Sequence, residues 1–328
     1  MVARDAPTLA LPQRGKECGL PRPFGERAGE SGTREETQVP RHAPTLALPP
    51  AGEGLSSEVL NFFNLKGANM SQQQALWAPG LFTGQRVLIT GGLGGIGREL
   101  VAQCQALGMQ VVVTDLAASM AKHGQSDLTC FAMDAKNAAS VHSAVTQAVQ
   151  ALGGLDACVN LVGYMSADQS LVRTEVEVWD DVMRGNLDSA FYISKAVLPH
   201  LHESPKASLV HVSSGLGAWA RPMVGAYGPA KAGLLLLMKE LALENAPKVR
   251  INAVAPGAVD TAFLRGGTGR SDEQGQPRVD PATYGRVVPL GRIAQPRDVV
   301  QPILFLLSPA SAYMTGQTLH INGGTYMP

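Results

Sequence analysis

The chain has 328 residues, 45% of them hydrophobic, which is enough for one large or two modest domains. Its 27 basic and 27 acidic residues balance, and no basic stripe occurs, so nucleic-acid binding gains no support. No apolar run approaches the roughly 20 residues that span a bilayer, and we expect neither a membrane anchor nor a secretory signal. The 4 cysteines are widely spaced, without a Cys-x-x-Cys pair, which fits a reducing, cytoplasmic location.

Residues 1–80 differ in composition from the rest of the chain. The first fifty residues contain eight prolines, and Ala-Pro-Thr-Leu-Ala-Leu-Pro occurs at both 6–12 and 43–49. Such a segment cannot bury enough apolar surface to offset the entropy lost on ordering. We therefore expect a disordered Pro/Gly-rich tail over 1–80 and a single catalytic domain over 81–328. The tail is either an interaction segment or translated upstream sequence before a true start at Met70.

From residue 86 onward, short valine-rich strands alternate with helices. A capping box, Thr174-x-x-Glu177, marks the start of a long helix. Strands that do not alternate in polarity and are separated by helices indicate a parallel sheet covered on both faces. The fold class is therefore α/β, with a doubly wound, mostly parallel, Rossmann-like sheet. The expected strands are 86–90, 110–114, 129–133, 155–162, 209–213, 249–255 and 318–321, and the expected helices are 96–107, 137–152, 174–202, 224–245 and 296–307.

A glycine-rich turn, Thr90-Gly-Gly-Leu-Gly-Gly-Ile-Gly97, joins the first strand to the first helix. Glycines let the backbone approach a pyrophosphate, and the helix N-terminus supplies N–H groups and a favourable dipole. Glycines at both 94 and 95 satisfy two known dinucleotide-binding spacings, so the residues alone leave the spacing open. A tight strand-to-helix turn without a ligand is the alternative interpretation.

Asp115 ends the second strand, eighteen residues after Gly97. A carboxylate there can accept hydrogen bonds from the adenosine ribose hydroxyls and would repel a 2′-phosphate. Positions 91–97 hold no basic residue, and none follows Asp115 until Lys122. We therefore expect NAD to be preferred over NADP. An ordinary turn or cap residue is the alternative role for this aspartate.

Tyr227 and Lys231 are four residues apart and share one helix face. A neighbouring ammonium favours the phenolate and lowers the pKa of a phenol, which can then exchange a proton with an alcohol or carbonyl. Pro229 lies between them and is tolerated only in a first helical turn, so this helix must begin near Val224–Tyr227. Together with Ser214, thirteen residues before the tyrosine, the pattern predicts an oxidoreductase. Each residue alone is equally typical of a helix surface or a strand end.

These residues, in this order, resemble the short-chain dehydrogenase/reductase family in its single-domain form, over roughly residues 82–328. The resemblance selects the spacing Gly91, Gly95, Gly97 within the turn. It implies a catalytic tetrad of Asn186, Ser214, Tyr227 and Lys231. It further implies that the cofactor is bound by Gly91, Gly95, Ile96, Gly97, Asp115, Asp134, Asn160, Gly163, Tyr227, Lys231, Pro256, Gly257 and Thr261.

The resemblance also assigns a role to each member of the tetrad. Tyr227 is expected to be the acid/base, and Lys231 to lower its pKa and hold the nicotinamide ribose. Ser214 is expected to polarise the carbonyl. Asn186 is expected to hold a water that links Lys231 to solvent.

One segment departs from the family pattern. Asn160-Leu161-Val162-Gly163 keeps the first and last positions of the family's Asn-Asn-Ala-Gly but replaces the middle two. This puts in doubt the usual hydrogen bonds behind the fourth strand. It does not affect the proton-transfer groups.

The resemblance implies a homotetramer or homodimer, with the apolar run Leu234–Met238 at the contact; burial in the domain core is the alternative. The seven histidines form no metal pattern, and we expect no metal. Residues 266–284 are expected to form the substrate lid. The expected substrate is a small alcohol or ketone, such as a 3-hydroxyacyl thioester, a cyclic diol, a sugar or a polyol. The competing functions are a non-catalytic dinucleotide-binding regulator and an NAD-using epimerase or lyase.

Overall fold

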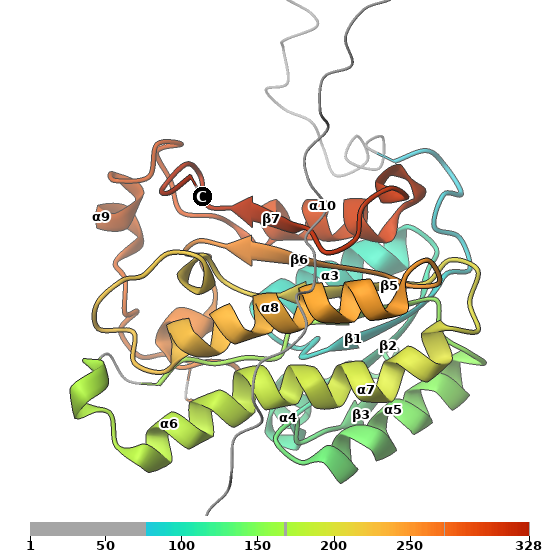
Figure 1. Cartoon of the computed structure of the whole chain (residues 1–328), viewed down its shortest axis with the longest axis horizontal. Helices are drawn as coiled ribbons and strands as arrows, with labels where there is room; N and C mark the ends of the chain where they lie inside the picture. Colours follow the sequence, from blue (N-terminus) through green and yellow to red (C-terminus); the bar gives the residue numbers. More distant parts are fainter. Residues whose placement is uncertain (1–76, 167–168, 272, 328) are drawn as a thin grey trace, which may run out of the picture. The chain divides into compact units, whose positions relative to one another are not determined.

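The computed structural model describes residues 77–166, 169–271 and 273–327 (Figure 1). The expected tail over 1–80 therefore lies outside the described residues, except for its last four positions. No helix in the described ranges carries an apolar stretch long enough to cross a bilayer.

Seven parallel strands form one sheet in the order β3-β2-β1-β4-β5-β6-β7. The strand order reverses between the neighbouring strands β1 and β4. The helices that follow these two strands, α3 and α7, pack on opposite faces of the sheet. Ligands of open α/β sheets bind outside the carboxyl ends of the strands at this switch point. The strands are β1 (Arg86–Thr90), β2 (Gln110–Asp115), β3 (Cys130–Ala132), β4 (Ala157–Asn160), β5 (Ser208–Val212), β6 (Arg250–Pro256) and β7 (Thr318–Ile321).

Helices cover both faces of the sheet (Figure 1). Leu88 and Leu209 point into the core formed with α5, α7 and α8, whereas Ile89 and Val210 point into the core formed with α3 and α10. The alternation follows from the two-residue period of a strand, and it makes both faces apolar. The larger helices are α3 (Gly95–Ala106), α5 (Ala138–Leu152), α6 (Val176–Met183), α7 (Ser189–Leu201), α8 (Tyr227–Asn245) and α10 (Pro296–Leu307).

The prediction of one capped helix over 174–202 is wrong in two respects. The Thr174 hydroxyl donates to Ser170 O at 3.1 Å, and the helix begins after Glu175 without a side-chain cap. The helix is also interrupted, because a π-helical turn at Arg184–Asp188 separates α6 from α7. Two short helices, α4 (Ala117–His123) and α9 (Pro281–Gly285), were not predicted, since neither is long enough to show a helical period.

The start of α8 is confirmed at Tyr227, with Pro229 inside its first turn. The Ser213 hydroxyl donates a hydrogen bond to Lys231 O at 3.0 Å, which holds the end of β5 against this helix. Of the apolar run in α8, Leu234 and Met238 are buried in the core, and Leu236 is 59% exposed. Core packing therefore accounts for much of this run.

Candidate active site

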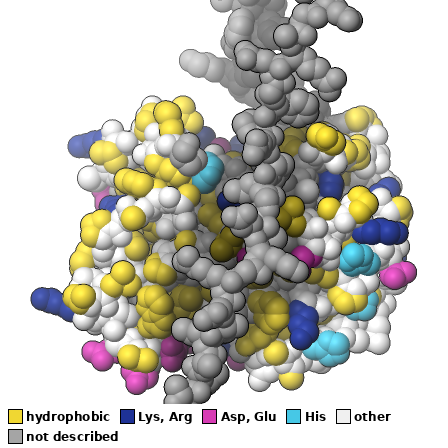
Figure 2. All heavy atoms as spheres, viewed as in Figure 1, with side chains coloured by type: hydrophobic (Ala, Val, Ile, Leu, Met, Phe, Trp, Pro, Cys, Tyr) yellow, Lys and Arg dark blue, Asp and Glu magenta, His cyan; other side chains and the backbone are white. Residues whose placement is uncertain are grey.

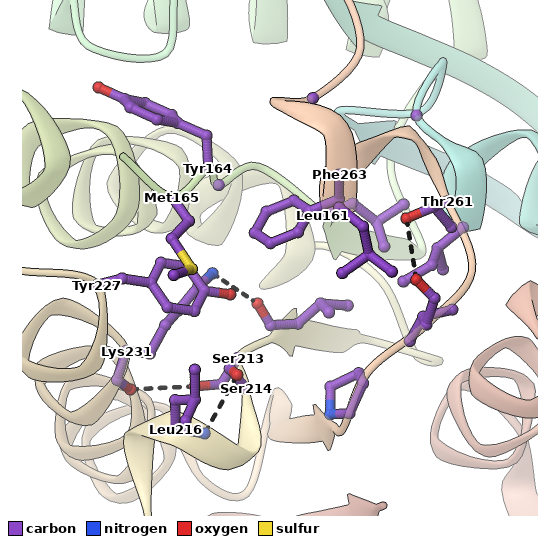
Figure 3. Close-up of a pocket in the computed structure, with 18 of the residues that line it drawn as sticks. Leu161, Tyr164, Met165, Ser213, Ser214, Leu216, Tyr227, Lys231, Thr261 and Phe263 are labelled. Atoms are coloured by element: carbon purple, nitrogen blue, oxygen red, sulfur yellow. Dashed lines mark hydrogen bonds between the residues drawn. The ribbon is translucent and has the colours of Figure 1, made fainter. Parts of the chain in front are cut away.

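A cavity of about 380 Å³ lies at the carboxyl ends of the strands. It is lined by the segments that follow β1, β2, β4, β5 and β6 and by the first two turns of α8. Figure 3 shows Tyr227 and Lys231 from α8 on one side of it and Thr261 and Phe263 on the other. The sequence predicted a site built from these segments, and the fold brings them to one place.

The glycine turn requires glycine at four of its positions, and at one of them, Gly92, a Cβ would lie 2.8 Å from Val113 Cγ1. A Cβ on Gly97 would lie 2.5 Å from Gly92 O, and one on Gly95 would lie 2.5 Å from the Thr261 methyl. Gly91 has a φ of +73°, which side chains rarely adopt. A Cβ on Gly94 would meet only Gly91 O at 3.5 Å, an ordinary contact. The spacing Gly91, Gly95, Gly97 is therefore the one that the backbone needs.

The Asp115 carboxylate pins this turn and also lines the cavity. Its Oδ2 accepts a hydrogen bond from Leu93 N at 2.9 Å, and its Oδ1 accepts one from Leu116 N at 2.8 Å. Each carboxylate oxygen has a second lone pair that can accept another donor. The cap role and the ligand role considered for this aspartate are therefore compatible.

These residues fit a nicotinamide dinucleotide. The N-terminus of α3 opens onto the cavity, where its first N–H groups lack intrahelical acceptors and suit a pyrophosphate. The glycines leave the backbone uncovered there, and Asp115 lies at the position from which a carboxylate can bind ribose hydroxyls. Asp134, which accepts a bond from Lys136 N at 3.0 Å, lines the same end of the cavity.

The proton-transfer groups come together at the other end. Tyr227 and Lys231 are 5% and 3% exposed, and the Lys231 Nζ lies 5.7 Å from the centre of the Tyr227 ring. This ammonium group donates to Val212 O at 3.1 Å, as Figure 3 shows. The Ser214 hydroxyl accepts a bond from Leu216 N at 3.2 Å. Two hydroxyls and one amine therefore line a single buried pocket.

Burial dominates the electrostatics of this end. It raises the pKa of Tyr227 to about 12, although a hydrogen bond with Ser214 partly offsets this rise. Burial also lowers the pKa of Lys231 to about 7. The sequence predicted a lowered pKa for this phenol, and the net direction is the opposite, because desolvation outweighs the hydrogen bond with Ser214.

Asn186 lies behind the cavity wall, in the π-helical turn. Its Nδ2 donates to Tyr164 O at 2.8 Å and Val182 O at 2.9 Å, and its Oδ1 accepts from Tyr164 N at 3.2 Å. Gly163 separates it from the lysine, since a Cβ there would lie 2.7 Å from Asn186 Oδ1 and 2.8 Å from Lys231 Nζ. The π turn thus brings the asparagine against the strand-end loop, as π turns at functional sites often do.

Asn160 also lies behind the wall. Its Oδ1 accepts bonds from Thr90 Oγ1 and Val162 N, both at 3.0 Å, and its Nδ2 contacts His211 Nδ1 at 3.2 Å. Burial, assisted by the charge of Lys231, lowers the pKa of His211 to about 3. The loop that departs from the family pattern is therefore still held by buried hydrogen bonds.

The expected lid does line the cavity, and it is held by side chains that the sequence did not single out. The Arg270 guanidinium lies 3.4 Å from the centre of the Tyr164 ring, and the Tyr164 hydroxyl donates to the Asp181 carboxylate. Lys136 pairs with the same aspartate at 2.7 Å. No spacing in the sequence links positions 136, 164, 181 and 270, so this cluster could be identified only from the three-dimensional structure.

The expected site residues therefore fall into two groups. Asn160 and Asn186 lie behind the cavity and support it. The others line it: Gly91, Gly95, Ile96, Gly97, Asp115, Asp134, Gly163, Ser214, Tyr227, Lys231, Pro256, Gly257 and Thr261.

Comparison with known proteins agrees with this geometry. Residues 91–326 match the family model described as enoyl-(acyl carrier protein) reductase. The chain is 34% identical over 249 residues to the 3-oxoacyl-(acyl-carrier-protein) reductase FabG of Vibrio cholerae, covering 74% of this chain and 98% of the relative. It is 32% identical over 251 residues to FabG of Escherichia coli, covering 75% and 99%.

Solved structures give the same result. A 3-ketoacyl-(acyl-carrier-protein) reductase from Brucella melitensis, complexed with NADH, superposes with a TM-score of 0.68 and 26% identity, covering 75% of this chain and 99% of that one. A glucose/ribitol dehydrogenase of the same organism superposes with a TM-score of 0.66 and 28% identity, covering 76% and 100%. The chain belongs to the short-chain dehydrogenase/reductase family. It is an NAD(P)-dependent oxidoreductase that acts on an alcohol/ketone pair.

Proposed function

We propose that Tyr227 is the acid/base of this reaction. In the reduction direction its hydroxyl donates a proton to the carbonyl oxygen, while the Ser214 hydroxyl donates a hydrogen bond to the same oxygen and polarises the C=O group. The bound nicotinamide cofactor supplies or accepts the hydride. Lys231 holds the cofactor ribose and places a positive charge near the phenol when it is protonated. Asn186 positions the Gly163–Tyr164 segment, which lies between it and Lys231.

The observation that carries this proposal is the burial of Tyr227 and Ser214 in one pocket that continues into the glycine-lined groove. The continuity supports a carbonyl oxygen held by two hydroxyls beside the nicotinamide end of a dinucleotide. The test is net oxidation of NADH, followed with a panel of ketones. Steady NADH consumption supports an oxidoreductase, whereas a regulator would bind NADH without consuming it and an epimerase or lyase would show no net change.

We further propose that NAD is preferred over NADP. The carboxylate of Asp115 lines the cofactor groove, and a 2′-phosphate near it would meet like charge. The Brucella melitensis neighbour, described as complexed with NADH, supports the choice by analogy. Lys122, the next basic residue after Asp115, does not line the cavity and donates to Ser271 O at 2.7 Å, so it offers no support for binding a 2′-phosphate.

Replacing Asp115 by Ser and Leu116 by Arg is expected to narrow or reverse the preference. The pair of changes removes the repelling charge and adds a cation for the phosphate. Loss of the Leu93 contact will weaken both cofactors alike, so the ratio of the NADH and NADPH dissociation constants is the quantity to measure. Equal affinities in the unmodified protein would show that Asp115 does not select the cofactor.

We also propose that the chain forms a homodimer or homotetramer through α7 and α8. The side chain of Phe191 on α7 is 45% exposed, and those of Leu236 and Leu243 on α8 are 59% and 81% exposed. Figure 2 shows hydrophobic side chains among the exposed ones on the face of the molecule that carries these helices. Sedimentation of the full chain at micromolar concentration should give at least a dimer, and replacing Leu236 by Glu should shift it toward monomer. A monomeric unmodified protein would contradict the proposal.

A further inference from the structure

An aromatic wall forms the end of the cavity beyond Ser214. Trp219 and Tyr326 both line the cavity, and their rings stack with centres 5.9 Å apart and planes 15° apart. The two residues come from distant segments, the loop before α8 and the C-terminal turn after β7. Stacking of this kind is a favourable arrangement of two aromatic rings, and both residues contribute to the cavity lining.

The C-terminal turn holds Tyr326 in this position. The Tyr326 hydroxyl hydrogen-bonds His320 Nδ1, and its carbonyl accepts a bond from Asn322 Nδ2 at 2.8 Å. Gly215 allows the close approach, because a Cβ there would lie 2.7 Å from Tyr326 Cε1. The ring therefore lies against the backbone of the residue that directly follows Ser214. The ring is therefore close to the place where a carbonyl oxygen bound to Ser214 would lie.

The remaining walls near the catalytic groups are largely apolar. The Phe263 ring lies 5.8 Å from the Tyr227 ring, and Met165, Leu216 and Met223 line the same part of the cavity. Figure 3 shows Met165 and Phe263 on the Tyr227 side of the cavity, with Leu216 next to Ser214. A substrate with many hydroxyl groups would lose its hydrogen bonds with water against these walls, at a cost of about 1–3 kcal/mol for each unpaired group.

Two cationic side chains also line the cavity. The Arg221 guanidinium lies 5.9 Å from the centre of the Tyr284 ring, and Arg278 donates to Met165 O at 3.0 Å. Neither of these contacts involves the stacked pair of Trp219 and Tyr326.

We propose that the substrate is a ketone, or the matching secondary alcohol, whose carbonyl carbon belongs to or adjoins an apolar ring, and that Trp219 and Tyr326 determine this specificity. The inference rests on the proposed function, because it assumes that Ser214 and Tyr227 hold the carbonyl oxygen. The ring lies along the Trp219–Tyr326 surface. Straight-chain 3-oxoacyl thioesters and polyhydroxylated ketones are the substrates that it disfavours.

The first experiment compares kcat/KM with NADH for three ketones. They are α-tetralone as the ring ketone, S-acetoacetyl-N-acetylcysteamine as the linear thioester, and dihydroxyacetone as the polar ketone. The ring ketone is expected to exceed each of the others by about tenfold or more, a difference that apolar contacts can supply. A higher value for the thioester or for dihydroxyacetone would overturn the proposal.

The second experiment tests the wall itself. The measured quantity is the ratio of kcat/KM for α-tetralone to that for butanone, which does not depend on the fraction of active protein. Trp219→Ala and Tyr326→Ala are each expected to lower this ratio by about tenfold, since an aromatic contact and its buried area supply at least about 1.4 kcal/mol. Trp219→Phe should retain most of the ratio. Tyr313→Ala, an aromatic change at a fully exposed position outside the cavity lining, should leave it unchanged.

The two kinds of failure are distinguishable. A ratio that stays the same in both alanine variants, with ketone turnover intact, would overturn the specificity role alone. Should either alanine variant fail to fold, the leucine variant at the same position, Trp219→Leu or Tyr326→Leu, removes the aromatic ring but keeps an apolar side chain; it is expected to lower the ratio, and an unchanged ratio counts against the proposal. Absence of NADH oxidation with every ketone, in protein that binds NADH, would instead contradict the proposed function.

Discussion

Replacing Tyr227 by Phe is expected to lower kcat by about 10²–10⁴, the range that general acid–base catalysis typically contributes. The change removes one oxygen and its proton while the ring keeps its contact with Phe263. Binding of NADH should change little, because the phenol is not proposed to anchor the cofactor. Steady-state kinetics with a ketone and a fluorescence titration with NADH separate the two effects.

The pH profile gives an independent check on the same residue. Oxidation of the alcohol requires the deprotonated phenol, and burial raises the pKa of Tyr227 to about 12, so kcat/KM for oxidation should rise with pH through the alkaline range. Tyr227→Phe should lose this rise. Tyr192→Phe, a matched change on α7 outside the cavity lining, should keep both the rate and the profile. A Tyr227→Phe enzyme with more than a tenth of the original kcat, chemistry being rate-limiting, would contradict the assignment.

Replacing Lys231 by Met is expected to abolish most activity and yet to stabilise the fold. Burial lowers the pKa of Lys231 from 10.5 to about 7, so between these pH values the unfolded chain binds the proton more tightly than the folded one. The buried amine therefore does not destabilise the fold above pH 10.5, where it is neutral in both states. It destabilises the fold increasingly as the pH falls toward 7. Each pKa unit corresponds to about 1.4 kcal/mol, so the buried charge costs on the order of a few kcal/mol at pH 6.

The melting temperature of Lys231→Met should therefore exceed that of the unmodified protein most at pH 6, and the gain should shrink toward pH 10. Lys239→Met is the matched control, because Lys239 lies exposed two turns further along α8. It should show no comparable pH-dependent gain. A Lys231→Met protein that melts below the unmodified one at pH 6 would show that this amine is not held at a cost to stability, a cost often found at functional sites.

The sheet and the main site residues could be predicted from the sequence because short-range signals set them. Valine-rich strands and the glycine turn are local patterns, and α8 begins at Tyr227 because Pro229 is tolerated only in a first turn. That Ser214, Tyr227 and Lys231 line one cavity could be expected because their order and spacing resemble those of a family; their catalytic roles remain a prediction.

Features that depend on tertiary contacts could not be predicted in this way. The capping box at Thr174 failed because its hydroxyl donates to Ser170 O instead. The pKa of Tyr227 is raised rather than lowered because the phenol is buried, which the spacing of residues in the sequence does not reveal. Tyr326 joins the site only because a turn after β7 returns the chain to Gly215.

The most direct test of the central claim follows the hydride itself. The full chain is incubated with NADH carrying deuterium at C4 of the nicotinamide, in turn on each face, and with a ketone that it reduces. One of the two labelled cofactors should transfer its deuterium to the carbinol carbon of the alcohol, as mass spectrometry or NMR would show. An alcohol product without deuterium from either cofactor would contradict direct hydride transfer at this site.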